Sequence, residues 1–166
     1  MNNSQQLQIL QYNIHKSKDI VLVPLLEDPE IQHFHLILIQ EPWHNPYIQT
    51  SYNPSQSNFH LLFYPHNDTR VAIYISKSIP ITDWSIQHIT PHLCALDIKV
   101  YFTDIVRTLQ IYNVYNPPPI STQDTTGPST LPALYKDLQE SPHEHTMVLG
   151  DFNLHHPLWG GCTMLS

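Results

Sequence analysis

Fifteen prolines are spread along the 166 residues and divide the chain into short segments. Because proline removes a backbone donor and breaks helix interiors, this spacing argues against a bundle of long helices. Hydrophobic residues make up 41% of the chain and charged residues 13%, a balance that excludes intrinsic disorder. A chain of this length is expected to form one domain, residues 1–166, with a single core.

Apolar segments separated by turn-like spacers predict eight strands and two helices. The expected strands are 7–14, 34–40, 59–64, 71–76, 83–89, 93–102, 106–115 and 146–149. The expected helices are 17–28, with Ser17 as a candidate cap, and 130–140. This order of elements predicts an α/β protein with mixed sheets and helices outside them.

Charge and cysteine content exclude several classes of protein. The net charge is −7, which argues against a pure nucleic-acid-binding module but not against a nuclease whose metal ions carry the positive charge. Two cysteines are too few for a disulfide scaffold or a four-thiolate zinc site. The N-terminus has no signal-peptide pattern, and the longest apolar stretch, 20–26, is too short to span a membrane. We therefore expect an intracellular protein that does not enter the membrane.

Polar side chains stand where four of the expected strands end: Asn13, Glu41, Tyr115, and the pair Asp151 and Asn153. Each has an ordinary explanation as a cap, a loop acid, a packing residue or a turn former. Side chains at strand ends can converge on one edge of a sheet. Together, their carboxylate, amide and hydroxyl groups suit Mg²⁺ or Mn²⁺ and phosphate oxygens.

Four runs of residues carry a family resemblance. They are Gln-Tyr-Asn at 11–13, Gln-Glu-Pro-Trp at 40–43, Asn-Val-Tyr-Asn-Pro-Pro at 113–118 and Gly-Asp-Phe-Asn-Leu-His-His-Pro-Leu-Trp-Gly at 150–160. In this order they resemble the endonuclease/exonuclease/phosphatase superfamily, which includes DNase I and the apurinic/apyrimidinic endonucleases. The closer similarity is to the endonuclease domain that begins the reverse-transcriptase polyprotein of LINE-type retrotransposons. The resemblance implies a DNase-I-like four-layer α/β sandwich.

The resemblance also implies roles for the matching residues. Glu41 would ligate a divalent metal, Mg²⁺ or Mn²⁺, with Asn13 beside it. Asp151 would deprotonate the attacking water, while Asn153 and Tyr115 would contact the scissile phosphate or lie near the leaving group. The implied reaction is hydrolysis of a DNA strand that leaves a 3′-hydroxyl. In the parent family the domain is fused to a reverse transcriptase, and an active protein would work in the nucleus.

The chain departs from the family pattern after residue 153. The family domain continues with further strands and a terminal Ser-Asp-His motif, and the sequence has none. We therefore expect an incomplete second sheet with an exposed strand edge and impaired catalysis. His155 and His156 are weak candidates for substrate contacts in place of the absent histidine. The alternative functions are an inactive remnant that binds DNA or a partner weakly and a small-phosphoester hydrolase. The runs at 40–43 and 155–160 disfavour the hydrolase.

Other patterns carry weaker hypotheses. The His-x-His pairs at 33/35 and 143/145 could bind zinc, but further ligands at motif spacing are missing. Trp43 and Trp159 could line a DNA groove, or could pack beneath their own loops. The basic residues are scattered and form no stripe.

Overall fold

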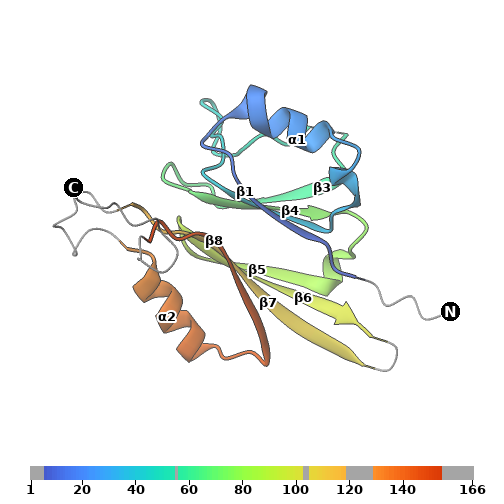
Figure 1. The fold of residues 1–166 in the computed structure, drawn as a ribbon, viewed down its shortest axis with the longest axis vertical. Helices are drawn as coiled ribbons and strands as arrows, with labels where there is room; N and C mark the ends of the chain where they lie inside the picture. The colour runs from blue at the N-terminus through green and yellow to red at the C-terminus, as the bar shows by residue number, and fades with distance from the viewer. Residues whose placement is uncertain (1–5, 55, 103–104, 119–128, 155–166) are drawn as a thin grey trace, which may run out of the picture.

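The computed structural model describes residues 6–54, 56–102, 105–118 and 129–154 (Figure 1). The strands are β1 (Ile9–Asn13), β2 (Leu36–Gln40), β3 (Phe59–Phe63), β4 (Val71–Ser76), β5 (Trp84–Thr90), β6 (Leu93–Tyr101), β7 (Val106–Tyr115) and β8 (His145–Asp151). The helices are η1 (Lys18–Leu22), α1 (Val23–Glu27), η2 (Ile31–His33), η3 (Ile81–Asp83) and α2 (Leu131–Glu140).

The described strands form two four-stranded sheets that face each other. Their orders are β1-β2-β4-β3 and β5-β6-β7-β8. The pairs β1–β2 and β7–β8 are parallel, and the other neighbours are antiparallel. α1 covers the outer face of the first sheet, and α2 lies on the outer side of the second (Figure 1). The predicted α/β sandwich is therefore confirmed.

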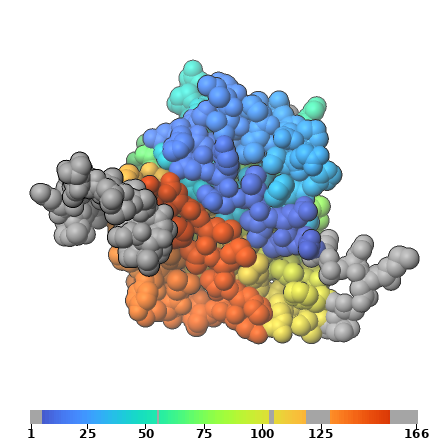
Figure 2. All heavy atoms as spheres, in the orientation of Figure 1, coloured from blue at the N-terminus to red at the C-terminus, as the bar shows by residue number. Residues whose placement is uncertain are grey.

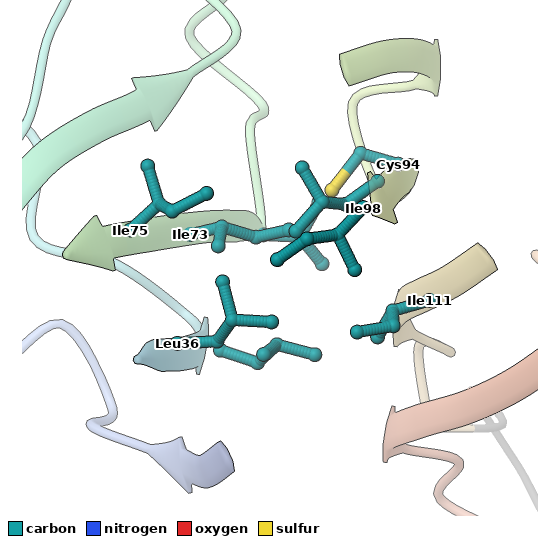
Figure 3. Packing of buried hydrophobic residues seen from close by; sticks show 9 residues of the cluster. Leu36, Ile73, Ile75, Cys94, Ile98 and Ile111 are labelled. Atoms are coloured by element: carbon teal, nitrogen blue, oxygen red, sulfur yellow. The ribbon is translucent and has the colours of Figure 1, made fainter. Parts of the chain in front are cut away.

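Alternating side chains along the strands create three apolar layers. Figure 3 shows the central layer, where side chains from the two sheets point toward one another. It contains Leu36, Leu38, Val71, Ile73, Ile75, Cys94, Leu96, Ile98 and Ile111. Residues between these positions face outward, because successive side chains in a strand point to opposite faces. Leu22 and Leu26 pack on the outer face of the first sheet, and Leu134 packs on that of the second. Each fully buried aliphatic side chain contributes about 1.5–3 kcal/mol.

The first helical segment differs from its prediction. Instead of one helix over 17–28, the chain forms the π-helix η1 followed by the short α-helix α1. Ser17 occupies the N-cap position of η1, as predicted, but its side chain makes no capping hydrogen bond. Pro24 lies in the first turn of α1, the part of an α-helix in which proline is best tolerated. None of the described helices is long and apolar enough to cross a membrane.

Buried ionisable groups predict that stability falls at alkaline pH. Burial raises the pKa of the Cys94 thiol from its ordinary value of 9.0 to about 12. It also raises the pKa values of Tyr74 and Tyr112 above 10.0. The unfolded chain ionises first, so the stability contribution of the Cys94 thiol is complete below pH 9.0 and is lost as the pH rises toward about 12. The expected loss is at most about 1.4 kcal/mol per pH unit per group.

Thermal melting against pH measures this effect. The melting temperature should be level from neutral pH to pH 9.0 and then fall. Cys94→Ala should delay the start of the fall toward the ordinary tyrosine pKa of 10.0. An unchanged melting curve up to about pH 12 in the wild type would show that these groups ionise in the folded protein without cost.

Candidate active site

Four strand ends meet at one edge of the two sheets. In the first sheet Asn13 pairs with Gln40, and Glu41 follows directly. In the second sheet Tyr115 pairs with Asp151. β1 and β8 lie side by side across the two sheets, and their blue and red surfaces adjoin in Figure 2. The carboxyl ends of two parallel strand pairs therefore bring the predicted residues to the same place.

Asn13 joins the two candidate carboxylates. Its Nδ2 donates to Glu41 Oε1 at 3.1 Å and to Asp151 Oδ2 at 2.8 Å. Its Oδ1 accepts a hydrogen bond from the backbone N–H of His15 at 3.0 Å. The amide thus bridges residues from both sheets, and its oxygen is already engaged. This arrangement supports a positioning role for Asn13 more directly than a role as a metal ligand.

Glu41 is held in an unusual backbone conformation. Its φ is 48°, in the left-handed region that non-glycine residues rarely adopt and that costs about 1–2 kcal/mol. Backbone hydrogen bonds on both sides hold it: its N–H donates to the Arg70 carbonyl and its own carbonyl accepts from Lys16, both at 2.8 Å. The carboxylate is 18% exposed, and His15 Nδ1 lies 3.3 Å from Oε1. Within the described residues Oε2 makes no hydrogen bond, so it is the oxygen available to a cation.

Asp151 is fixed by the turn that follows it. The backbone N–H of Asn153 donates to Asp151 Oδ1 at 3.2 Å, and Asn153 has a φ of 45°. The Asn153 side chain donates through Nδ2 to the Asn116 carbonyl at 2.8 Å. Asn116 in turn donates from its backbone N–H to the Asp151 carbonyl at 2.8 Å. One amide hydrogen of Asn153 therefore binds within the turn, and within the described residues the other makes no hydrogen bond.

Tyr115 stands beside the carboxylates as a neutral phenol. Burial raises its pKa above the ordinary value, and the negative charges of Glu41 and Asp151 raise it further, whereas Arg70 opposes them. The His92 ring meets the Tyr115 ring edge to face at 5.8 Å. At neutral pH the hydroxyl is consequently protonated and can donate a hydrogen bond to a phosphate oxygen.

Sequence reasoning missed a buried polar network beneath this edge. Gln40 and Asn113 are completely buried, and Gln40 Nε2 donates to Asn113 Oδ1 at 2.5 Å. Asn113 Nδ2 donates to the backbone carbonyls of Ile39 and Ala72 at 3.2 and 2.9 Å. Gln11 also donates to Gln40. The signal in the sequence was a polar residue inside each of two apolar strands, and the network links the sheets under the candidate site.

Other predicted residues take different places. Trp43 packs against the outer core of the first sheet, and Lys18 Nζ lies 4.9 Å from its ring centroid. These contacts give Trp43 a packing role, and substrate contact stays a prediction. His155, His156 and Trp159 lie outside the described residues. In the described ranges no three His, Cys, Asp or Glu side chains cluster as a metal site, and this includes both His-x-His pairs.

The donor set is compatible with Mg²⁺ or Mn²⁺. Glu41 and Asp151 contribute carboxylates that share Asn13 as a partner. Mg²⁺ is commonly held by one or two carboxylates together with waters and substrate phosphates. Glu41, through Oε2, would be the residue that holds the ion, with Asp151 facing it across Asn13.

Comparisons with known proteins identify the fold. A crystal structure of D. rerio TDP2 in complex with a single-strand DNA product matches 89% of the chain, with a TM-score of 0.53 and 14% sequence identity. A humanized D. rerio TDP2 carrying 14 mutations matches 92%, with a TM-score of 0.53 and 14% identity. The chain has a DNase-I-like fold. A family model described as endonuclease-reverse transcriptase also matches residues 109–164, about a third of the chain.

These findings confirm the resemblance to the endonuclease/exonuclease/phosphatase superfamily. The DNase-I-like chain spans 61% and 66% of the length of the two solved chains. No curated protein sequence matches it at a significant level. The roles of the individual site residues stay predictions.

Proposed function

We propose that the chain is a divalent-metal-dependent phosphodiesterase of the retrotransposon endonuclease type, which hydrolyses one strand of DNA and leaves a 3′-hydroxyl. The observation that carries this proposal is the bridge that Asn13 makes between the carboxylates of Glu41 and Asp151. The family model and the DNA-bound TDP2 structure support a nucleic-acid substrate. Fusion to a reverse transcriptase and action in the nucleus belong to the same proposal.

Asp151 is the proposed general base. Its carboxylate is oriented by Asn13 on one oxygen and by the Asn153 backbone on the other, which leaves it aimed by two donors. A carboxylate placed in this way can take a proton from water as the water attacks phosphorus. The proposed role of Asn13 is to keep this base and Glu41 at a constant separation.

Glu41 and Tyr115 are proposed to stabilise the negative charge that develops on the phosphate. A bound Mg²⁺ would supply electrostatic stabilisation of the phosphoryl oxygens and of the departing 3′ oxygen. Glu41 would hold that ion through the oxygen that Asn13 and His15 leave available. Tyr115, neutral at physiological pH, would donate a hydrogen bond to the same phosphate, a kind of contact worth about 10²–10³ in rate.

Nicking of supercoiled plasmid tests this proposal. Purified protein should convert the plasmid to the open circular form with Mg²⁺ or Mn²⁺ and not with EDTA. A DNA polymerase should extend the nicks without prior phosphatase treatment, because the product end is a 3′-hydroxyl. Folded protein that leaves the plasmid intact in both metals would contradict the proposal and favour a remnant that at most binds DNA.

A further inference from the structure

Two of the seven basic side chains have no partner in the described structure. All seven Lys and Arg residues lie in described ranges. Five of them make ion pairs or hydrogen bonds: Lys18 with Asp19, Lys77 with the Ser57 carbonyl, Lys99 with Asp83, Arg107 with Glu144 and Lys136 with Glu140. Within the described residues the side chains of Lys16 and Arg70 make neither kind of contact.

Both of these basic residues form backbone hydrogen bonds with Glu41. Lys16 donates its N–H to the Glu41 carbonyl at 2.8 Å, and the Glu41 N–H donates to the Arg70 carbonyl at 2.8 Å. The three residues therefore lie in a row, with Glu41 in the middle. Two strand spacings, about 10 Å, separate the outer members. That span is comparable to two phosphate steps along a nucleic-acid strand, about 7 Å along the helix axis.

Arg70 lies on the side of the site where Tyr115 stands. The backbone N–H of Arg70 donates to the Pro91 carbonyl at 2.8 Å. The backbone N–H of Tyr115 donates to the next carbonyl, that of His92, at 2.9 Å. Arg70 lowers the pKa of Tyr115 while Glu41 raises it, so both charged groups lie close enough to Tyr115 to act on its hydroxyl. Arg70 is half-buried, and the Glu41 oxygen Oε1 is already engaged by Asn13 and His15.

Lys16 lies on the opposite side of Glu41. It follows Asn13 and His15 in the turn after β1, with a φ of 59° that carries it away from the strand direction. It is exposed, so its ammonium group is free to meet a ligand in solvent. A site with two carboxylates at its centre and one unpaired cation on each side matches a row of phosphates better than it matches one small phosphoester.

We propose that Arg70 and Lys16 bind the backbone phosphates on either side of the phosphodiester that is cleaved, so that the substrate is a nucleic-acid strand. This inference rests on the proposed function, because that function defines which phosphodiester bond is cleaved. Arg70 offers a planar guanidinium with paired donors that suits a phosphate, whereas Lys16 acts as a point charge. Arg70 is therefore expected to make the stronger contact.

Binding measured without cleavage is the first test. Fluorescence anisotropy of a fluorescein-labelled oligothymidylate, with Ca²⁺ in place of Mg²⁺, gives Kd over a range of salt concentrations. Arg70→Gln should weaken binding about tenfold at low salt. It should also reduce the slope of log K against log salt by about 0.7, the value for one phosphate contact to a single strand.

Matched variants separate this effect from loss of folding. Lys16→Gln should weaken binding about threefold and lower the salt slope by a similar amount. Arg70→Lys should keep most of the slope because it keeps the charge. Arg107→Gln, in which the lost cation is already paired with Glu144, should leave the slope unchanged. Equal slopes in the wild type and in a folded Arg70→Gln variant would overturn the proposal.

Two substrates then distinguish flanking phosphates from the cleaved one. Arg70→Gln should raise KM for the oligonucleotide about tenfold, and it should slow turnover of bis(4-nitrophenyl) phosphate, which has a single phosphate, by a clearly smaller factor. An equal loss on both substrates would place Arg70 at the reacting phosphate and contradict the inference. If the wild type cleaves neither substrate, the proposed function fails, while the salt slopes still decide whether Arg70 and Lys16 bind phosphates.

Discussion

Asp151→Asn is expected to lower plasmid nicking at least a thousandfold. The substitution removes the proposed general base, and such groups contribute about 10²–10⁴ in rate. It also disturbs the site, because the two oxygens of Asp151 accept from two donors, Asn13 Nδ2 and the Asn153 N–H. An asparagine side chain has one acceptor oxygen and one donor nitrogen. One of the two contacts therefore places two hydrogen-bond donors against each other. Initial nicking rates at saturating Mg²⁺ measure the effect.

Glu140→Gln is the matched control for this substitution. It makes the same carboxylate-to-amide change in α2, where Glu140 is exposed and, among the described residues, forms an ion pair only with Lys136. Its nicking rate should equal that of the wild type within error, and its melting temperature should differ little. Wild-type nicking by a folded Asp151→Asn protein would show that cleavage does not depend on Asp151.

Gly150→Ala is expected to prevent stable folding of the second sheet. Gly150 has a φ of 149°, and an added Cβ would lie 1.9 Å from the Val114 carbonyl oxygen and 2.7 Å from its carbon. Both are backbone atoms of the neighbouring strand β7, so no side-chain rotation relieves the clash. Only separation of β8 from β7 can do so, and this breaks the pairing that sets Asp151 beside Tyr115.

The expected loss of stability makes Gly150→Ala a severe substitution. A loss above about 4 kcal/mol is expected, against a total stability of about 5–15 kcal/mol for a typical domain. Urea denaturation followed by circular dichroism measures it. Thr146→Ala in the same strand has an exposed side chain and should cost less than about 0.5 kcal/mol. Similar midpoints for the two variants would mean that β7 and β8 approach less closely than described.

Strand positions and the polar strand ends were predictable from the sequence, for physical reasons. A nearly continuous apolar run such as Leu36–Gln40 indicates a strand buried on both faces, and all five of its residues are buried. The boundaries of β4 and β7 agree with their predictions. Parallel strands place their carboxyl ends at a common edge, so Asn13 could be expected near Glu41 in one sheet, and Tyr115 near Asp151 in the other.

The remaining features depend on contacts that local sequence does not encode. The hydrogen bond from Asn13 to Asp151 spans 138 residues and exists only because β1 and β8 lie side by side. In the sequence Arg70 is one of several scattered basic residues. It lies beside Glu41 only because β4 pairs with β2, and this pairing could not be predicted from local sequence. Ser17 stands at the N-cap position, but its side chain makes no capping hydrogen bond to the π-helix that follows, a segment that the sequence pattern predicts as an α-helix.

Binding of Mn²⁺ is the measurement that tests the central claim most directly. Electron paramagnetic resonance of free Mn²⁺ follows titration of the wild type, Glu41→Gln and Glu140→Gln. If Glu41 holds the cation, the wild type and Glu140→Gln should bind Mn²⁺ alike, and Glu41→Gln should bind at least tenfold more weakly. Equal Mn²⁺ binding by all three proteins would contradict the assignment of this edge as a metal-dependent active site.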